Sequence, residues 1–449
     1  MNKFTLPRLL TRLLLLCTTA FAGDYSTWAK YRNVTVNTAG INSTGVGKIP
    51  VLIRLNVTGQ FDMFTQSEAV LPNGADIRIT KADGTTDLPF EVDSWTSGTS
   101  GAGALWVLLD TLPPNTSYPL RIYWNKAGVT TASNGPAVFS AANGFLAAWH
   151  FSQEAGLPLL DATGNNTATP AGGAAAPTNN ASSIIGFGKT FNGTSQFYQV
   201  GTDASALNLN SNTGPYTITA WANVDTCTTR VVVFSKYANS NSTAGGRQYA
   251  LQTATTPTSW RITNAVPALS TNASNNEFAA DDLSSCSNKT WTYLAASYET
   301  RGAAPVGDSI GASKLQLRVN SRPIVYGTLF SETGSSIGTA SNTYIGKIAS
   351  NDRYMKGSLD EITVSNVTRS ADWLRVSYEN QKAGSTTVSI DAQSTPPTTA
   401  VAGGLQAHRS AGKTRLVLSK NGVLLERHLG NGDTFLHTLD GKRFEADQP

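Results

Sequence analysis

The sequence predicts an all-β protein, with two β-sandwiches in tandem and a small C-terminal β-hairpin tail. Only 14% of the 449 residues are charged, whereas Ser, Thr, Asn, Gly and Ala are abundant. Short runs rich in Val, Ile, Tyr and Trp recur between turn residues, which is typical of closely spaced strands. A chain of this length can bury two or three separate cores.

Residues 1–22 have the features of a secretory signal peptide. Basic residues precede a short leucine run, and an A-x-A cleavage site ends at Ala22. Lipidation of Cys17 is a weaker alternative, because the bulky Leu16 stands before it. We therefore predict a protein that is secreted or at the cell surface. No later run approaches the roughly 20 apolar residues of a spanning helix, so no transmembrane helix is predicted.

Two cysteines remain in the predicted mature chain, Cys227 and Cys286. In an oxidising compartment such a pair favours a disulfide. Two free, buried thiols are the alternative. No Cys/His cluster accompanies the pair, so a zinc site of that kind is not expected.

Residues 24–138 are predicted to form the first sandwich, of about seven strands. Turn sequences such as KADGTTD, PNG and LPPNTS separate short apolar or alternating runs. Those runs are YRNVTVN, KIPVLIRLNV, ADIRIT, LPFEVDSW, ALWVLLD and YPLRIYW.

Residues 143–384 are predicted to form the second sandwich, in which Asn192-Gly193 makes a hairpin turn. Its last strand is SLDEITVSNV. After it, Ser370 is expected to cap a short helix in which Leu374 and Tyr378 share the face that lies on the sandwich.

The C-terminal part differs in composition. A Pro/Thr/Ala/Gly linker is predicted at 391–404, and the tail at 405–449 carries more charge. Two hairpins are predicted there, over Asn421-Gly422 and Asp440-Gly441. The tail weakly resembles C-terminal sorting modules of secreted bacterial surface proteins, which implies a role in secretion or attachment.

Two family resemblances follow from the order of these motifs. The first sandwich resembles the bacterial domain of unknown function 2341, on the W-x-x-Y-R pattern of Trp28, Tyr31 and Arg32 and on ADIRIT, LPFEVDSW and ALWVLLDTLPPNTSYPLRIYW. The second resembles the laminin-G-like, concanavalin A-like jelly roll that commonly follows that domain. Its segments are AAWHF, DATGNN, GKTFNGTSQFYQV, YTITAWANV, WTYLAASYE and KGSLDEITVSNVTRSADWLRVSYENQ.

Calcium is the one cofactor that the second resemblance implies. Jelly rolls of this kind often fix a loop with oxygen ligands, and Asp161 and Asp360 stand at the matching positions. A departure from the family weakens this expectation, since the usual F-D-E is Phe151-Ser152-Gln153 here. For Asp161 the alternative is an Asx turn, which needs no metal.

No catalytic constellation is predicted. Glucanases with the jelly-roll fold carry E-x-D-x-x-E on one strand, but the nearest match, Glu91-x-Asp93, lacks the last acid and lies in the first sandwich. Asp360 and Glu361 are consecutive, so strand alternation predicts opposite faces, with Glu361 solvated or paired with a surface cation. His150 stands between two aromatic residues and is expected to be packed or superficial. We therefore predict that the protein is not an enzyme.

Sugar binding requires exposed aromatic rings beside polar groups. Trp260, in the loop-flanked PTSWRITN, is the predicted platform, with Tyr237, Arg247 and Tyr249 near it in sequence.

The leading hypothesis is a secreted or cell-surface binding protein that recognises carbohydrate or cell-wall polymer. A structural or adhesive protein that binds other proteins is the alternative, and a glycoside hydrolase is the third. The formal charge of +4 is spread along the chain without a basic stripe, so no nucleic-acid partner is expected.

Overall fold

The protein was analysed as a computed structural model that separates into two compact units, Met1–Pro396 and Pro397–Pro449. The predicted signal peptide and most of the predicted linker lie outside the described residues. The structure describes residues 23–64, 70–171, 176–201, 207–209, 214–238, 246–255, 258–266, 276–299, 314–332, 341–350, 353–392, 414–419, 422–428, 434–438 and 443–444.

The first sandwich packs a four-stranded sheet on a three-stranded sheet. The strand orders are β23(Val388–Ile390)-β1(Lys30–Asn37)-β6(Ser117–Trp124)-β3(Arg78–Lys81) and β2(Val46–Asn56)-β5(Ala102–Leu112)-β4(Phe90–Thr96). Alternation on β1 buries Val34 and Val36, and β2 and β5 contribute longer apolar runs to the same core. Short helical turns connect the strands: α1(Phe61–Phe64), η2(Pro72–Gly74), α2(Gly135–Val138) and η3(Ala141–Asn143).

Strand β23 comes from the far end of the second sandwich and completes the first. Val34 of β1 pairs with Ile390, and the backbone N–H of Asp391 donates to the carbonyl of Asn33 over 3.0 Å. Arg32 also donates to the Asp391 carbonyl, over 2.6 Å. The predicted seven strands are therefore reached only with a segment that lies far outside 24–138.

The second sandwich consists of two eight-stranded antiparallel sheets. One runs β19(Val325–Tyr326)-β18(Leu315–Val319)-β17(Thr292–Tyr298)-β12(Tyr216–Val224)-β22(Lys356–Ser365)-β10(Gly188–Asn192)-β9(Thr178–Asn180), with β7(Phe145–Trp149) paired to β22. The other runs β20(Thr328–Glu332)-β16(Asn276–Leu283)-β15(Thr258–Val266)-β14(Arg247–Thr255)-β13(Val232–Tyr237)-β21(Thr343–Ile345)-β11(Phe197–Val200)-β8(Ala168–Ala171). A large apolar cluster, including Trp149 and Ile362, fills the space between them.

The predicted disulfide is present. Cys227 and Cys286 are bonded, with their Cα atoms 5.9 Å apart, and the bond joins the segments that follow β12 and β16. Closing a loop of this length stabilises the fold by roughly 4 kcal/mol on the chain-entropy model.

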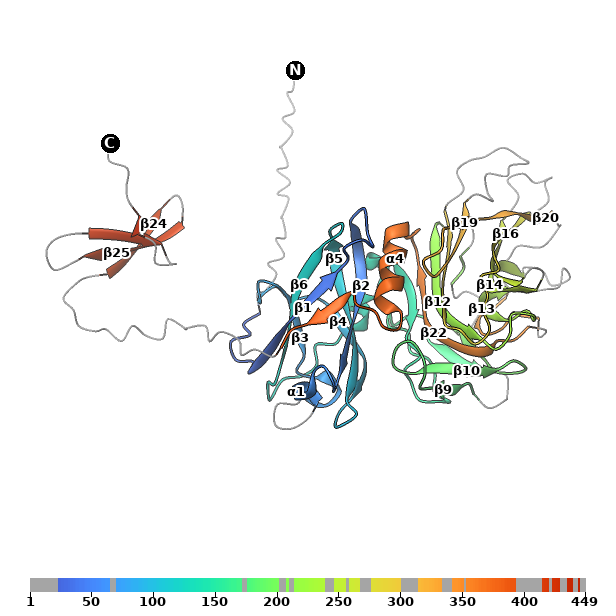
Figure 1. The fold of residues 1–449 in the computed structure, drawn as a ribbon, viewed down its shortest axis with the longest axis horizontal. Helices are drawn as coiled ribbons and strands as arrows, with labels where there is room; N and C mark the ends of the chain where they lie inside the picture. Colours follow the sequence, from blue (N-terminus) through green and yellow to red (C-terminus); the bar gives the residue numbers. More distant parts are fainter. Residues whose placement is uncertain are drawn as a thin grey trace, which may run out of the picture. The chain divides into compact units, whose positions relative to one another are not determined.

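Helix α4(Ala371–Gln381) lies between the two sandwiches (Figure 1). Its start is as predicted, since Ser370 Oγ accepts from the N–H of Trp373 over 3.2 Å. Leu374 is buried, and Tyr378 packs on the same apolar cluster. That cluster continues from the core of the first sandwich to Trp221 on the outer face of the second, so the two sandwiches share one packed interface.

The C-terminal unit contains one antiparallel sheet, β24(Thr414–Ser419)-β25(Gly422–His428)-β26(Thr434–Thr438)-β27(Arg443–Phe444). β24 pairs with β25 and β26 with β27, as the two predicted hairpins require, while Asn421 and Asp440-Gly441 lie outside the described residues. Because β25 also pairs with β26, the four strands form a single sheet. Among the described residues, no helix has the length and apolar character to cross a membrane.

Candidate functional site

The predicted sugar platform does not exist as an exposed surface. Trp260 lies within β15 and is completely buried in the sandwich core, as is Tyr249, whose hydroxyl donates to the carbonyl of Leu207 over 3.0 Å. Tyr237 is also buried, with the Arg247 guanidinium 5.3 Å from its ring centroid. The prediction was wrong because Trp260 belongs to a strand, where alternation places it on the inner face with Ile262.

Asp161 fits the Asx-turn alternative. Its Oδ1 accepts from the N–H groups of Ala148 (2.8 Å) and Thr163 (2.9 Å). Its Oδ2 accepts from the N–H of Asn166 (2.8 Å) and from the Thr163 hydroxyl. These donors surround both oxygens, so the geometry of Asp161 gives the predicted calcium role no support.

Asp360 and Glu361 lie on the same face of the sheet, which corrects the prediction of opposite faces. Leu359 and Ile362 both point into the jelly-roll core, and the two acids between them both point outward. A β-bulge on β22 causes this: Thr363 pairs with Thr219 and Asp360 with Trp221, so two residues face one on β12. The backbone accommodates the extra residue at Glu361, whose φ is 49°.

Glu361 is buried, not solvated as predicted, because it meets His150 at the junction of the sandwiches. Its Oε2 lies 2.8 Å from His150 Nδ1. The imidazole is held by aromatic neighbours, stacked on Trp106 with centroids 5.6 Å apart and edge-on to Phe139 at 5.1 Å. His150 is therefore a packed histidine, as expected, and it also has an acidic partner on each side.

The first sandwich supplies Glu91 and Asp93 to the same place. Glu91 pairs on the ladder with Trp106, and its Oε2 is 3.4 Å from His150 Nε2. Asp93 is the extra residue of a bulge on β4, between the pairs Val92 with Leu105 and Ser94 with Ala104. Ser152 Oγ donates to Asp93 Oδ1 over 2.6 Å. We call Glu91, Asp93, His150, Asp360 and Glu361 the junction cluster.

Burial and mutual charge shift the pKa values of the junction cluster. Burial raises the pKa of Asp93 to about 7, against the opposing effect of His150. Burial and the charge of Glu361 raise the pKa of Asp360 well above its usual value. Burial alone would lower the pKa of His150, but the charges of Glu361 and Glu91 raise it well above 6.5. Burial therefore opposes negative charge on Asp93 and Asp360, while the charges of Glu361 and Glu91 favour a positive charge on His150.

Two basic side chains border the cluster, yet their hydrogen bonds go elsewhere. Arg54 donates to the carbonyls of Asn380 (3.1 Å) and Ile184 (3.2 Å). Lys189 Nζ donates to the carbonyl of Phe151 over 2.6 Å and to Asn179 Oδ1 over 2.8 Å, and burial lowers its pKa to about 8. Neither cation donates a hydrogen bond to a cluster carboxylate.

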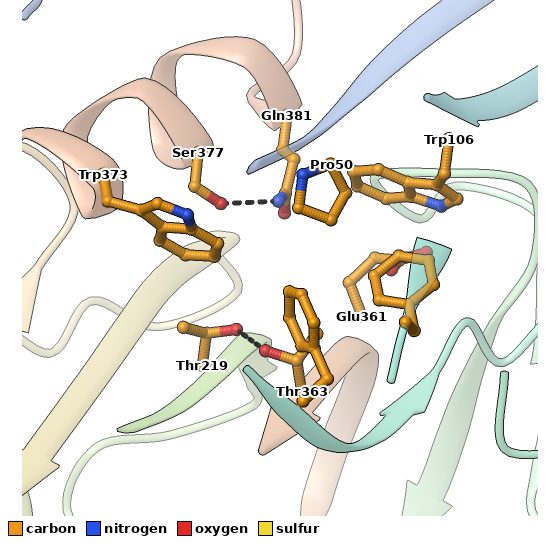
Figure 2. Close-up of a pocket in the computed structure, with 10 residues that line it drawn as sticks. Pro50, Trp106, Thr219, Glu361, Thr363, Trp373, Ser377 and Gln381 are labelled. Carbon is orange, nitrogen blue, oxygen red and sulfur yellow. Dashed lines mark hydrogen bonds between the residues drawn. The ribbon is translucent and has the colours of Figure 1, made fainter. Parts of the chain in front are cut away.

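Two spaces adjoin the cluster. Figure 2 shows the first, a cavity of about 10 Å³ where Glu361 and Trp106 lie beneath α4; it has room for about one water. The second is a cleft of about 570 Å³ on the first sandwich, which Asp93 and Trp95 line together. The cleft also includes Pro72, Asn73, Ala75, Val92, Thr130, Thr131 and Ser133.

The sequence contains signals for this site, but none of them is sufficient alone. Glu91-x-Asp93 is an incomplete glucanase motif, and His150 is an isolated histidine. Only the packing of the two sandwiches brings them to Glu361. Trp95 was not singled out, because nothing in its local sequence separates it from a core tryptophan.

The fold and the comparisons define the class of the protein as a tandem β-sandwich protein with a concanavalin A-like second domain. Residues 73–152 match the domain of unknown function (DUF2341). Residues 192–375 match the concanavalin A-like lectin/glucanases superfamily. The chain therefore carries these two domains in the predicted order. Because the superfamily includes lectins, the second match favours a carbohydrate-binding module.

No curated protein matches the chain. Among solved structures, a Trypanosoma rangeli sialidase in complex with 2,3-difluoro-KDN has 13% identity and a TM-score of 0.36, and the match covers 57% of this chain and 34% of the sialidase chain. Domain 4 of AbnA, an extracellular arabinanase from Geobacillus stearothermophilus, in complex with arabinotriose, has 18% identity and a TM-score of 0.31, and the match covers 52% of this chain and 97% of that domain. The chain thus spans about a third of the sialidase, and TM-scores below 0.5 give these similarities no weight for function.

Proposed function

We propose that the protein is an exported, non-catalytic binding protein that recognises carbohydrate or cell-wall polymer through the cleft on its first sandwich. The observation that carries the proposal is the composition of the cleft: one partly exposed indole, Trp95, beside an amide, a carboxylate and three hydroxyl side chains. The concanavalin A-like second domain supports the same class of ligand.

The chemistry of the cleft suits a sugar. Indole rings pack on the apolar faces of pyranoses, while amides, carboxylates and hydroxyls bond the sugar hydroxyls. Asn73 and Thr131 are exposed at the cleft, so their polar groups are accessible. A volume of about 570 Å³ lies within the range of small-ligand sites.

The walls of the cleft are fixed by the fold. Trp95 stacks on Phe64 with centroids 4.8 Å apart. Ser133 Oγ accepts from the N–H of Val92 over 2.8 Å, which ties the 130–133 segment to β4. A site on fixed walls loses little conformational entropy when a ligand binds.

Glycan arrays and pull-downs with insoluble polysaccharides test the proposal. We expect the wild-type protein to bind. Trp95→Ala should lower the affinity at least about tenfold, because aromatic side chains at the centre of a binding site carry much of the binding energy. Asn73→Ala should weaken binding without disturbing the Trp95–Phe64 stack. The control is Tyr326→Ala, which removes an aromatic ring that is 56% exposed on the second sandwich.

The alternatives give different results. Capture of a surface protein with no glycan signal would favour the adhesive alternative. Release of reducing sugar by the purified protein, abolished in Asp93→Asn, would favour a glycoside hydrolase. Glycan binding that Trp95→Ala and Asn73→Ala both leave unchanged would remove the cleft from the proposal. Recovery of the protein only in the cytoplasm of its own cells would contradict export.

A further inference from the structure

The junction cluster contains buried polar atoms without hydrogen-bond partners among the described residues. They are Glu91 Oε2, Asp93 Oδ2, His150 Nε2, Asp360 Oδ1 and Glu361 Oε1. The three residues of the second sandwich are at most 4% exposed: Asp360 0%, Glu361 3% and His150 4%. Buried polar atoms are rarely left unpaired, and buried carboxylates are paired or coordinate metals. Glu91 Oε2 and His150 Nε2 face each other at 3.4 Å, so the three remaining carboxylate oxygens, on Asp93, Asp360 and Glu361, point to a missing partner.

We propose that Asp93, His150 and Glu361 bind a divalent transition-metal ion of the zinc or manganese class. One ligand atom from each of the three residues lies within 4.8 Å of the others. At a tetrahedral ion with bonds of about 2.0–2.2 Å, two ligand atoms lie about 3.3–3.6 Å apart, so side-chain movements that total up to about 1.5 Å complete the site.

The two nitrogens of His150 have different surroundings, and these assign their roles. Nδ1 faces Glu361 Oε2 at 2.8 Å and is the nitrogen on the side of the proposed ligands. Nε2 faces Glu91 Oε2 at 3.4 Å, so Glu91 accepts the remaining ring proton and orients the imidazole. A carboxylate on the second nitrogen is the usual support for a metal-binding histidine. Glu91 is thus a positioning residue.

The donor set selects the kind of ion. An imidazole beside two carboxylates suits zinc or manganese, whereas calcium takes six to eight oxygen ligands and magnesium keeps most of its waters. The free Oδ1 of Asp360 can accept a hydrogen bond from a water on the ion. The ion's route from solvent is the cleft, since Asp93 lines it and is partly exposed.

An ion in this place would join the two sandwiches. Asp93 belongs to β4 of the first sandwich and Glu361 to β22 of the second, so a bond to each fixes one against the other. The two positive charges of the ion would also compensate the negative charge of the buried carboxylates in the junction cluster, to which Arg54 and Lys189 donate no hydrogen bond. The proposed role of the ion is structural. Asp93 also lines the cleft, but the metal content and the Tm are measured without a glycan, so they test the ion separately.

The test uses the full mature chain without a polyhistidine tag, stripped with EDTA and dialysed against Zn²⁺, Mn²⁺, Ca²⁺ or Mg²⁺. We expect about one Zn²⁺ or Mn²⁺ per chain by elemental analysis and a rise in Tm of at least about 4 °C. Asp93→Asn should lose both effects. Asp110→Asn, which changes a carboxylate that is 70% exposed, is the matched control and should keep them.

A second readout needs no variant. Titration of the stripped wild-type protein with Co²⁺ should give visible absorption bands that saturate at one equivalent, and Zn²⁺ should displace them. The proposal is overturned if these bands are absent, if Asp93→Asn binds and is stabilised like the wild type, or if only Ca²⁺ or Mg²⁺ raises the Tm. Because the histidines of the tail are present in both proteins, they cannot produce a difference between wild type and Asp93→Asn.

Discussion

At the scale of single residues, two β-bulges decide what the junction contains. Asp93 is the extra residue of β4, and Glu361 has a φ of 49° on β22. Without the bulge on β22, strict alternation after Leu359 and Asp360 would point the Glu361 side chain into the jelly-roll core, where a carboxylate has no partner. A bulge increases local strand twist and redirects a side chain, which is why bulges are frequent beside functional sites.

Gly357, at the start of β22, is required by a close approach of two backbones. Its φ is 130°, and a Cβ there would lie 2.1 Å from the carbonyl oxygen of Asn223 on β12. Gly357→Ala should therefore lower the free energy of unfolding by about 3 kcal/mol or more, because the backbone of β12 has to move. Chemical denaturation measures this.

Gly156→Ala is the matched control for Gly357→Ala. Gly156 also has a positive φ, of 86°, but nothing lies within 4 Å of an added Cβ. Gly156→Ala should lower the free energy of unfolding by only about 1 kcal/mol, the cost of placing alanine in the left-handed backbone conformation. Equal effects of the two substitutions would contradict the explanation from close approach.

At the scale of elements, α4 connects the sandwiches through polar contacts as well as apolar ones. Asn380 accepts from the N–H of Leu52 over 2.7 Å and donates to the Leu52 carbonyl over 3.0 Å, so it pairs with β2 as a strand would. Trp221 of the second sandwich donates to Gln381 Oε1 over 2.8 Å. One helix thus satisfies polar groups of both sandwiches.

Asp372, in the first turn of α4, makes this connection dependent on pH. Its burial raises the pKa, but hydrogen bonds from Thr44 and Ser43 outweigh that effect and lower it to about 2. A lowered pKa stabilises the fold above the unfolded value of 3.8, and this stabilisation is lost as the pH falls through about 2.

Asp372→Asn should therefore lower the free energy of unfolding by about 2 kcal/mol at pH 7 and by much less near pH 2. Denaturation of both proteins across this pH range measures the difference. Asp110→Asn, at an exposed ion pair with Lys48, should have little effect at either pH. A pH-independent loss in Asp372→Asn would contradict the role given to the carboxylate.

Local signals in the sequence predicted local structure well. The cap at Ser370, the disulfide and the strand pattern depend on neighbours in sequence or on cell compartment. The hairpin predicted at Asn192-Gly193 was wrong, because β10 pairs with β22 and β9 in one sheet whereas β11 pairs with β21 and β8 in the other. The bulges at Asp93 and Glu361 did not follow from sequence, because nothing distinguishes them from regular strand until the partner strand is known. Trp260 was misplaced for the same reason, since its exposure depends on strands that are distant in sequence.

At the scale of the whole molecule, the two sandwiches of the first unit depend on each other. One apolar cluster includes Leu120 of the first sandwich, Tyr293 of the second and Trp373 of the helix between them. The chain then returns through β23 to pair with β1. The first sandwich is complete only with β23, which lies outside both predicted sandwich ranges, 24–138 and 143–384.

This arrangement predicts different effects for two truncations. A chain that ends at Pro396 retains the first compact unit and should keep its Tm. A chain that ends at Thr387 lacks β23 and leaves β1 as an edge strand, so its Tm should fall by at least about 3 °C. Differential scanning calorimetry compares them, and equal Tm values would mean that β23 contributes nothing to the fold.

The proposed function depends on carbohydrate binding in the cleft beside Trp95. A crystal structure of the protein with an oligosaccharide selected from the glycan array is the decisive measurement. We expect a sugar ring in contact with the Trp95 indole, with its hydroxyls bonded to Asn73 or Thr131. A sugar bound only elsewhere, with the cleft holding solvent at saturating ligand, would contradict it.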